Sequence, residues 1–207
     1  MPNNADANGN PHGAESDFTK IVPMAAQVYG LNLPCEKKEG FRFLLQPEME
    51  AYFNGEMTLT AGTSDFMAEW QAFINNAWIT YSDICSRISG GGNFYLTHGD
   101  MPGNLVRDKN NKLYIIDWDD ILEAPIERDF WLYMDSEDNI GKIAEILNEN
   151  GVKWKFNQNY YRYYVYTRFF EDLYGYLEAD MIAKTPEINY ARTLKTEVFD
   201  WLVPMMG

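Results

Sequence analysis

The sequence is poor in cysteine and histidine, which limits the kinds of site that it can build. Its 207 residues include two cysteines, Cys35 and Cys85, and two histidines, His12 and His98. Two cysteines do not make a disulfide framework in a chain of this length, and such a chain is typical of the reducing cytosol. Two histidines argue against a histidine-rich metal centre. We therefore predict a cytoplasmic protein whose two cysteines are small buried side chains.

Long apolar runs and basic segments are also missing. No stretch approaches the ~18 apolar residues that a transmembrane helix needs. Residues 1–15 are polar and lack the regions of a secretory signal, so we expect a flexible tail. Lys and Arg number 17 against 31 Asp and Glu, which gives a net charge of −14. This charge argues against nucleic acids and membranes as partners, and it favours a cationic ligand or metal ions.

The acidic residues are concentrated in one stretch. Residues 98–138 contain eleven Asp or Glu residues and four Lys or Arg residues, so they carry half of the net charge of −14. Carboxylates that lie close together repel, and each raises the pKa of its neighbours unless a cation is present. A divalent metal ion is one physical remedy, and exposure on solvated loops is another.

Hydrophobic residues recur at helical spacing over most of the chain. The spacing predicts helices over residues 17–29, 48–53, 65–88, 138–148 and 159–182, and a last helix from Thr185 onward. Thr63 or Ser64 is expected to cap the helix over 65–88, and Trp201 is expected to face inward. Short strands are predicted over 94–97, 105–107 and 113–116, the last two joined as a hairpin. The sequence therefore predicts an α+β, mainly helical domain that holds one small hairpin.

Two polar motifs lie at the ends of the predicted strands. The first is His98-Gly99-Asp100 followed by Asn104, and the second is Asp117-Trp118-Asp119-Asp120. A hairpin brings such points together. Asp100 could accept a proton from a hydroxyl nucleophile, and Asn104 and Asp117 supply hard oxygen ligands of the kind that Mg²⁺ prefers. Phosphoryl transfer needs such a set: a base or orienting carboxylate, and metal ions that neutralise phosphate charge.

The paired motifs resemble the catalytic loop and the metal loop of aminoglycoside phosphotransferases, a plan shared by choline kinases and eukaryotic-like protein kinases. Residues 113–120, with Ala124-Pro125 and Glu127-Arg128-Asp129, are especially similar to the spectinomycin phosphotransferase branch. The later residues 160–163, with Arg168 and Glu171-Asp172, also resemble a helix of that branch. The match is strongest over residues 96–131.

The resemblance implies a kinase-like C-terminal lobe and a role for each matching residue. Asp100 would be the catalytic base, and Asn104 and Asp117 would bind Mg²⁺. His98 would hold the loop by a hydrogen bond, and Asp129 would brace the catalytic loop and cap the next helix. The implied protein is a transferase that uses ATP as phosphate donor and a hydroxyl of a small, cationic molecule as acceptor.

The sequence departs from the family in two respects. Three residues separate Asp100 from Asn104, one fewer than usual, and the shorter loop is expected to redirect the Asn104 side chain. No glycine loop and strand lysine of the kind that grip nucleotide phosphates accompany Lys20, Lys37 and Lys38. We therefore predict that residues 16–207 form the C-terminal lobe without its N-terminal lobe. The chain would then be a truncated kinase, a lobe that works with a separate N-terminal lobe chain, or a homo-oligomer.

Two other functions compete with the kinase hypothesis. The first is a non-catalytic, degenerate kinase lobe that binds a cationic ligand or a partner through its acidic surface. The acids of the predicted helix over 159–182, namely Glu171, Asp172, Glu178 and Asp180, could face such a ligand. The second is a metal-dependent hydrolase built on Asp117, Asp119 and Asp120, which the shortage of histidine disfavours.

Overall fold

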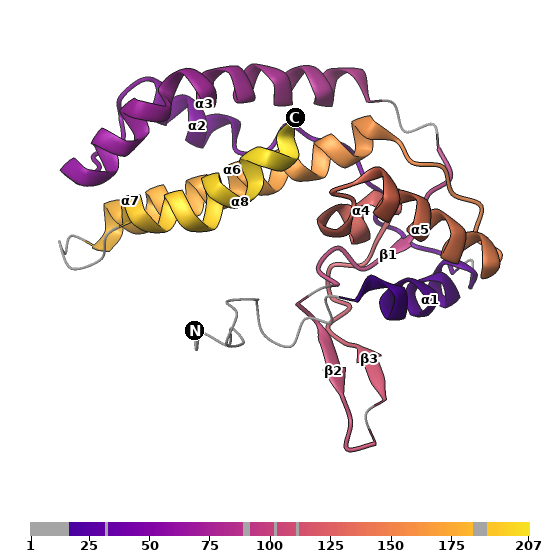
Figure 1. Ribbon diagram of the computed structural model, residues 1–207. Coiled ribbons are helices and arrows are strands. Elements are labelled where there is room, and N and C mark those ends of the chain that lie inside the picture. Colours follow the sequence, from indigo (N-terminus) through magenta and orange to yellow (C-terminus); the bar gives the residue numbers. More distant parts are fainter. Residues whose placement is uncertain (1–16, 32, 89–91, 102, 111, 184–189) are drawn as a thin grey trace. The chain divides into compact units, whose positions relative to one another are not determined.

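The computed structural model describes residues 17–31, 33–88, 92–101, 103–110, 112–183 and 190–207. The chain divides into two compact units (Figure 1). The first unit comprises Met1–Gly40 and Gly90–Tyr161, and the second comprises Phe41–Ser89 and Arg162–Gly207. The predicted tail, residues 1–15, lies outside the described residues.

The first unit contains two helices that pack together and four short strands. Helix α1 is Phe18–Tyr29 and α5 is Glu137–Glu149. Asp17 caps α1, because its side chain accepts a hydrogen bond from the Thr19 amide. Helices α1 and α5 lie side by side (Figure 1). The inner face of α1 is buried, and α5 buries Ile143 and Leu147. Their apolar stripes form the core on which the strands rest.

The four strands form two separate antiparallel pairs. Strand β1 (Tyr95–Thr97) pairs with β4 (Leu122–Ala124), and β2 (Leu105–Arg107) pairs with β3 (Leu113–Ile115). In the first pair Thr97 lies opposite Leu122, and in the second Leu105 lies opposite Ile115. The chain therefore passes from β1 through a loop to the β2–β3 hairpin and back through a second loop to β4. Helix α4 (Glu127–Phe130) follows β4 directly.

The second unit is helical. It contains α2 (Gln46–Phe53), α3 (Ala61–Arg87) and the larger part of α6 (Gln158–Ala183). Aromatic side chains fill the interface between α3 and α6, where the Tyr81 and Phe170 rings stack with centroids 5.6 Å apart. The chain ends in α7 (Tyr190–Thr193), a π-helical turn (Leu194–Phe199), α8 (Asp200–Leu202) and a 3-10 turn (Val203–Met206).

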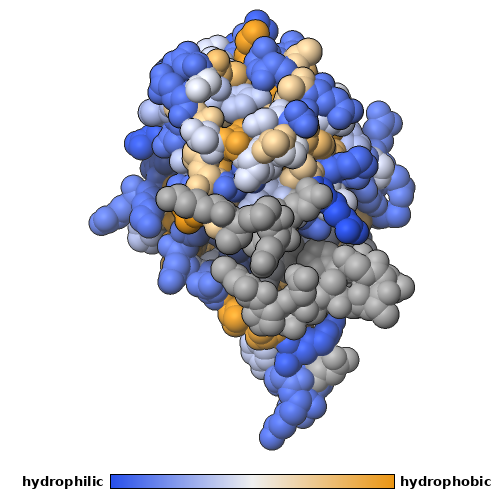
Figure 2. Space-filling model, turned by 90° about the vertical axis from the view of Figure 1, so that its left-hand side faces the viewer, coloured by the Kyte–Doolittle hydropathy of each residue, from blue (hydrophilic) through white to orange (hydrophobic). Residues whose placement is uncertain are grey.

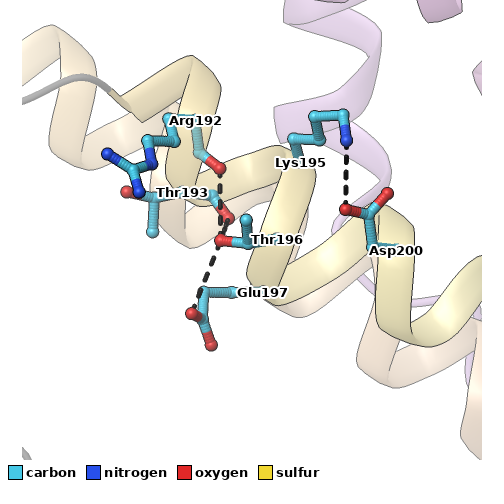
Figure 3. A network of polar contacts seen from close by, with 6 residues as sticks. All are labelled: Arg192, Thr193, Lys195, Thr196, Glu197 and Asp200. Atoms are coloured by element: carbon cyan, nitrogen blue, oxygen red, sulfur yellow. Dashed lines mark hydrogen bonds and ion pairs between the residues drawn. The ribbon is translucent and has the colours of Figure 1, made fainter. Parts of the chain in front are cut away.

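The π-helical turn of the second unit carries its own polar contacts (Figure 3). The Thr196 hydroxyl lies 3.2 Å from the carbonyl oxygen of Arg192 and 3.4 Å from that of Thr193. Lys195 forms an ion pair with Asp200 over 3.2 Å. The turn buries Leu194, Val198 and Phe199 on its other side, so the polar contacts lie on its outer face.

Most predicted elements lie within a few residues of their observed bounds, but α3 begins earlier than predicted. Its first turn is held by Asp180 of α6, which accepts hydrogen bonds from the Thr60 amide (2.7 Å), the Thr60 hydroxyl (2.8 Å) and the Thr63 hydroxyl (2.9 Å). The predicted local cap by Thr63 or Ser64 is therefore wrong, because a distant carboxylate fills that role. Asp180 is also buried, so it is not one of the exposed acids that could face a ligand.

Other differences concern strands and burial. Strand β4 was not expected, so the structure has two strand pairs where the sequence predicts one hairpin. Trp201 is 42% exposed, whereas it was expected to face inward, and both cysteines are half-buried. The predicted helix start at Thr185 lies outside the described residues. The prediction of an α+β, mainly helical fold is confirmed.

One face shows mostly hydrophilic residues with small apolar spots between them (Figure 2). Among the described residues, no helix combines the length and the apolar character needed to cross a membrane.

Candidate functional site

The loop after β1 carries Asp100, and Gly99 shapes it. Gly99 has a φ of +91°, a conformation that residues with a side chain rarely adopt. A Cβ atom at this position would overlap the guanidinium group of Arg128. Glycine is therefore needed both for the backbone turn and for the close approach of Arg128. The turn leaves the Asp100 side chain exposed at the surface.

Asp129 of α4 holds the backbone of this loop. Its oxygens accept hydrogen bonds from the amides of His98 (3.1 Å) and Gly99 (2.7 Å) and from the Tyr29 hydroxyl (2.7 Å). Asp129 is only 2% exposed, and this burial raises its pKa, although the three donors oppose the shift. Asp129 does not cap α4 as expected, since it lies within that helix and its oxygens face the loop and Tyr29.

His98 joins the Asp100 loop to the acidic loop. Its Nδ1 accepts a hydrogen bond from the Asp100 amide over 3.2 Å, and its Nε2 lies 2.7 Å from the carbonyl oxygen of Ile116. Because a carbonyl oxygen only accepts, Nε2 must carry the proton, and the ring is the neutral Nε2–H tautomer. The ring is buried and packs edge-on against Trp118, with centroids 4.8 Å apart.

The register of the hairpin brings Asn104 and Asp117 to the same end. Leu105 pairs with Ile115, and the Ile116 amide donates to the Asn104 carbonyl over 2.9 Å. Asp117 follows immediately, in the left-handed region with a φ of +62°. The Asn104 side-chain Nδ2 in turn donates to the carbonyl oxygen (2.8 Å) and to the carboxylate (3.1 Å) of Asp100. The structure thus joins Asp100 to Asn104 and places Asp117 next to Asn104 along the ladder.

Asp117 and Asn104 at this end of the hairpin carry oxygen atoms of the kind that Mg²⁺ prefers. The Asp117 carboxylate is exposed, and because Nδ2 of Asn104 is engaged with Asp100, its Oδ1 remains as the atom that could bind a metal ion. Mg²⁺ is commonly bound by one or two carboxylates together with substrate phosphates and water. The short spacing between Asp100 and Asn104 is used for direct contact between the two side chains.

The acidic loop does not form a larger metal centre. In the part of the chain that the structure describes, no group of three or more His, Cys, Asp and Glu side chains is arranged to hold a metal ion. Asp117, Asp119 and Asp120 are all exposed. They do not form the cluster on which the hydrolase hypothesis depends.

Glu127 is a buried carboxyl group beside this site. It is 1% exposed, and its Oε1 accepts hydrogen bonds from the Trp154 indole (3.2 Å) and the Asn157 amide (2.8 Å). Burial raises its pKa from 4.5 to about 7, even though these donors lower it. Glu127 thereby anchors the segment between α5 and α6. Burial makes its ionised form less favourable, so this contact stabilises the protein less when Glu127 is charged.

We expect Glu127 to make the protein less stable as the pH rises. The folded state holds the Glu127 proton more tightly than the unfolded state, so its contribution is fully present below pH 4.5 and is lost as the pH rises through about 7. The shift corresponds to about 3 kcal/mol. Glu127→Gln keeps the accepting oxygen without the charge, so it should flatten this part of the pH dependence in urea unfolding between pH 5 and pH 8.

The matched control for this prediction is Glu145→Gln on the exposed face of α5. Other buried acids, Asp129 among them, contribute to the pH dependence of both the wild type and Glu127→Gln. The difference between Glu127→Gln and the wild type isolates Glu127 from them. Equal pH slopes in the two proteins would contradict the prediction.

The strand pairs, the braced Asp100 loop and the surrounding helices define the fold of a kinase-like C-terminal lobe. Two solved structures of spectinomycin phosphotransferase share it, each with a TM-score of 0.65. The AMP-bound complex is 19% identical over 91% of this chain, and the complex with ADP and spectinomycin is 20% identical over 95%. The resemblance predicted from the motifs is therefore confirmed at the level of the fold.

The chain spans less than two thirds of those proteins, 61% of the first and 65% of the second. No protein-family model matches the sequence, and no curated protein matches it. The likeness is thus carried by the three-dimensional arrangement together with the paired motifs.

Sequence reasoning missed several residues that shape this site. Tyr29 comes from α1 and Thr97 from β1, and no local pattern marks either of them as a partner of the loop. Arg128 stands in the motif with Glu127 and Asp129, but its role becomes visible only when the loop packs over it. The signal that could have found Arg128 is its place next to an aspartate that braces the loop.

Proposed function

We propose that the chain is the catalytic lobe of an ATP-dependent phosphotransferase that transfers the γ-phosphate to a hydroxyl group of a small molecule. The observation that carries the proposal is the hairpin register, which puts Asp117 beside Asn104, while Asn104 contacts Asp100. A base and two hard oxygen ligands thus come from two loops that are braced from α4. The shared fold with spectinomycin phosphotransferase supports this reading.

Asp100 is proposed to orient the acceptor hydroxyl and to take up its proton. Its carboxylate is exposed, so an acceptor can reach it. The Asn104 amide fixes one carboxylate oxygen by a hydrogen bond of 3.1 Å, which leaves the other free for the hydroxyl proton. Asp129 holds the amides of His98 and Gly99 just before Asp100, and His98 accepts a hydrogen bond from the Asp100 amide itself, so the carboxylate starts from a fixed position.

Asp117 and Asn104 are proposed to hold Mg²⁺. The ion would supply positive charge that neutralises the phosphate oxygens of the nucleotide. Asp117 would contribute a carboxylate oxygen and Asn104 its Oδ1. This proposal is supported by the backbone, because Asp117 has a left-handed φ and directly follows Ile116, whose amide donates to the Asn104 carbonyl.

The acceptor is proposed to be cationic, because the net charge of −14 attracts such molecules. We further propose that residues 16–207 act as a C-terminal lobe in the cytoplasm and that an N-terminal lobe, which grips the nucleotide phosphates, is supplied in addition to it. Spectinomycin, present with ADP in one of the similar structures, is a reasonable first acceptor to test.

A second candidate function is a binding module that keeps the acidic loops without catalysis. The observation in its favour is the direct bond between Asn104 and Asp100, which occupies part of both side chains. A cationic ligand would then pair with the exposed carboxylates of Asp117, Asp119 and Asp120. Turnover of ATP that depends on Asp100 separates the two candidates.

Calorimetric titration with ATP, with and without Mg²⁺, tests the proposed metal site. We expect nucleotide binding that strengthens with Mg²⁺, and Asp117→Asn should weaken the Mg²⁺-dependent part by about 100-fold, the upper end of the losses known for residues around a metal. The matched control is Asp119→Asn, an exposed carboxylate two residues further along the same loop. Binding that does not respond to Mg²⁺ in the wild type, whether or not an N-terminal lobe is supplied, would refute the proposed function.

A further inference from the structure

The acidic loop between β3 and β4 is held at two points by different side chains. At its beginning, His98 bonds the carbonyl oxygen of Ile116, directly before Asp117. At its far end, Nη2 of Arg128 donates to the carbonyl oxygen of Asp120 over 2.9 Å. The segment that carries Asp117 therefore runs between two anchors, one from the Asp100 loop and one from α4.

Arg128 reaches the start of the Asp100 loop at the same time. Its Nη1 donates to the Thr97 hydroxyl over 3.0 Å, and the guanidinium lies against Gly99. The Thr97 hydroxyl also links Arg128 to β4, since it donates to the carbonyl oxygen of Leu122 over 2.8 Å. One planar group thus touches the loop of Asp100 and the loop of Asp117.

Arg128 and Asp129 are neighbours in sequence, and they form hydrogen bonds of opposite direction. The Asp129 carboxylate can only accept hydrogen bonds, and it accepts them from the amides of His98 and Gly99. The Arg128 guanidinium can only donate, and it donates to the Asp120 carbonyl and to the Thr97 hydroxyl. Together the two side chains bind the Asp100 loop at Thr97, His98 and Gly99 and the acidic loop at Asp120.

We propose that Arg128 is a positioning residue that fixes the spacing between Asp100 and Asp117 by binding both of their loops. The inference rests on the proposed function, because the spacing matters for a nucleotide–metal complex held between the two carboxylates. Arg128 itself touches neither substrate nor metal ion. The fork of the guanidinium is essential, because two donors must point in two directions from one rigid plane.

The lack of a side chain at Gly99 is also needed for the contacts of Arg128. Only glycine lets the guanidinium lie against the loop backbone, so the glycine of His98-Gly99-Asp100 and Arg128 depend on each other. A lysine at position 128 keeps the charge, but its single ammonium group cannot bridge Thr97 and Asp120 as a planar fork does. Arg128→Lys therefore separates geometry from charge.

The indole signal of Trp118 reports on the loop without any assay of function. Trp118 lies between the two anchors, its Nε1–H donates to the carbonyl oxygen of Ile115 over 3.1 Å, and its ring packs on His98. The protein has 6 tryptophans, so its nitrogen–proton NMR spectrum has few indole signals, and Trp118→Phe assigns the relevant one. We expect Arg128→Lys to shift or broaden the Trp118 signal and to leave the other indole signals in place.

A second measurement is the calorimetric affinity for ADP as a function of Mg²⁺. Loss of a residue that orients metal ligands typically weakens metal binding by about 10- to 100-fold, and we expect that range for Arg128→Lys. Arg87→Lys is the matched control, because Arg87 forms a surface ion pair with Asp83 over 2.7 Å. It should change neither readout. A purely structural role for Arg128 would lower the unfolding midpoint without changing the Mg²⁺ affinity of the folded protein.

The two readouts keep the failure of this inference apart from the failure of the proposed function. A wild type without Mg²⁺-dependent nucleotide binding, both alone and with an N-terminal lobe supplied, removes the proposed function, and the Trp118 signal then decides alone whether Arg128 anchors the loop. An unchanged Trp118 signal together with unchanged Mg²⁺ affinity in Arg128→Lys overturns the inference. If Arg128→Lys does not fold, Thr97→Val, which removes the hydroxyl at 3.0 Å, must shift the same signal or the inference falls.

Discussion

Asp129→Ala should lower the free energy of unfolding by about 3–5 kcal/mol, because it leaves two buried donors and one half-buried donor without an acceptor. The donors are the amides of His98 and Gly99 and the hydroxyl of Tyr29. Each unpaired buried donor costs about 1–3 kcal/mol. Removal of the buried carboxylate offsets part of this destabilisation, because its burial disfavours the charged form and raises the pKa of Asp129.

Urea unfolding followed by circular dichroism measures this loss, and Tyr29→Phe is its control. Tyr29→Phe removes the single hydrogen bond of 2.7 Å and leaves both loop amides paired, so it should cost about 1–2 kcal/mol. Asp129→Asn should fall between the two, because one carboxylate oxygen becomes an amide that cannot accept. Equal losses in Asp129→Ala and Tyr29→Phe would show that the loop amides do not depend on Asp129.

Local patterns in the sequence carry most of the secondary structure of this protein. The apolar spacing in α1, α3, α5 and α6 predicts those helices within a few residues, because their buried stripes follow the helical repeat. Strand β4 has three residues and no alternating pattern, so its pairing with β1 becomes apparent only in three dimensions. The start of α3 likewise depends on Asp180, a residue 120 positions away from Thr60.

Some residues of the candidate site could be predicted from the sequence, and others become apparent only in the structure. Asp100, Asn104 and Asp117 lie in motifs with characteristic spacing, so a resemblance can point to them. Tyr29 and Arg128 act through bonds to the backbone of distant loops, and such bonds leave no spacing pattern in the sequence. Burial of Glu127 is equally hidden, since an acid after Ala124-Pro125 would ordinarily be expected at the surface.

Asp100→Ala should abolish most phosphoryl transfer if the proposed function is correct. A positioned general base contributes about 10²- to 10⁴-fold to a rate, so we expect kcat to fall by that factor. Because Asp100 is exposed and only its Asn104 contact is lost, the unfolding midpoint should stay close to that of the wild type. ADP release in the presence of Mg²⁺, ATP and spectinomycin, with other cationic aminocyclitols as further acceptors, measures the effect.

Asp138→Asn is the matched control for Asp100→Ala, since Asp138 is an exposed aspartate that pairs with Lys142 on α5. It should leave turnover unchanged, because that pair lies on a helix surface outside both loops. Asp100→Asn adds a second test: it keeps the size of the side chain but cannot take up a proton, so it should be nearly as inactive as Asp100→Ala. Turnover in Asp100→Ala equal to that of the wild type would exclude Asp100 as the base. Turnover that is absent from the wild type even with an N-terminal lobe supplied, with a cationic ligand still bound through Asp117 and Asp119, would instead favour the binding module.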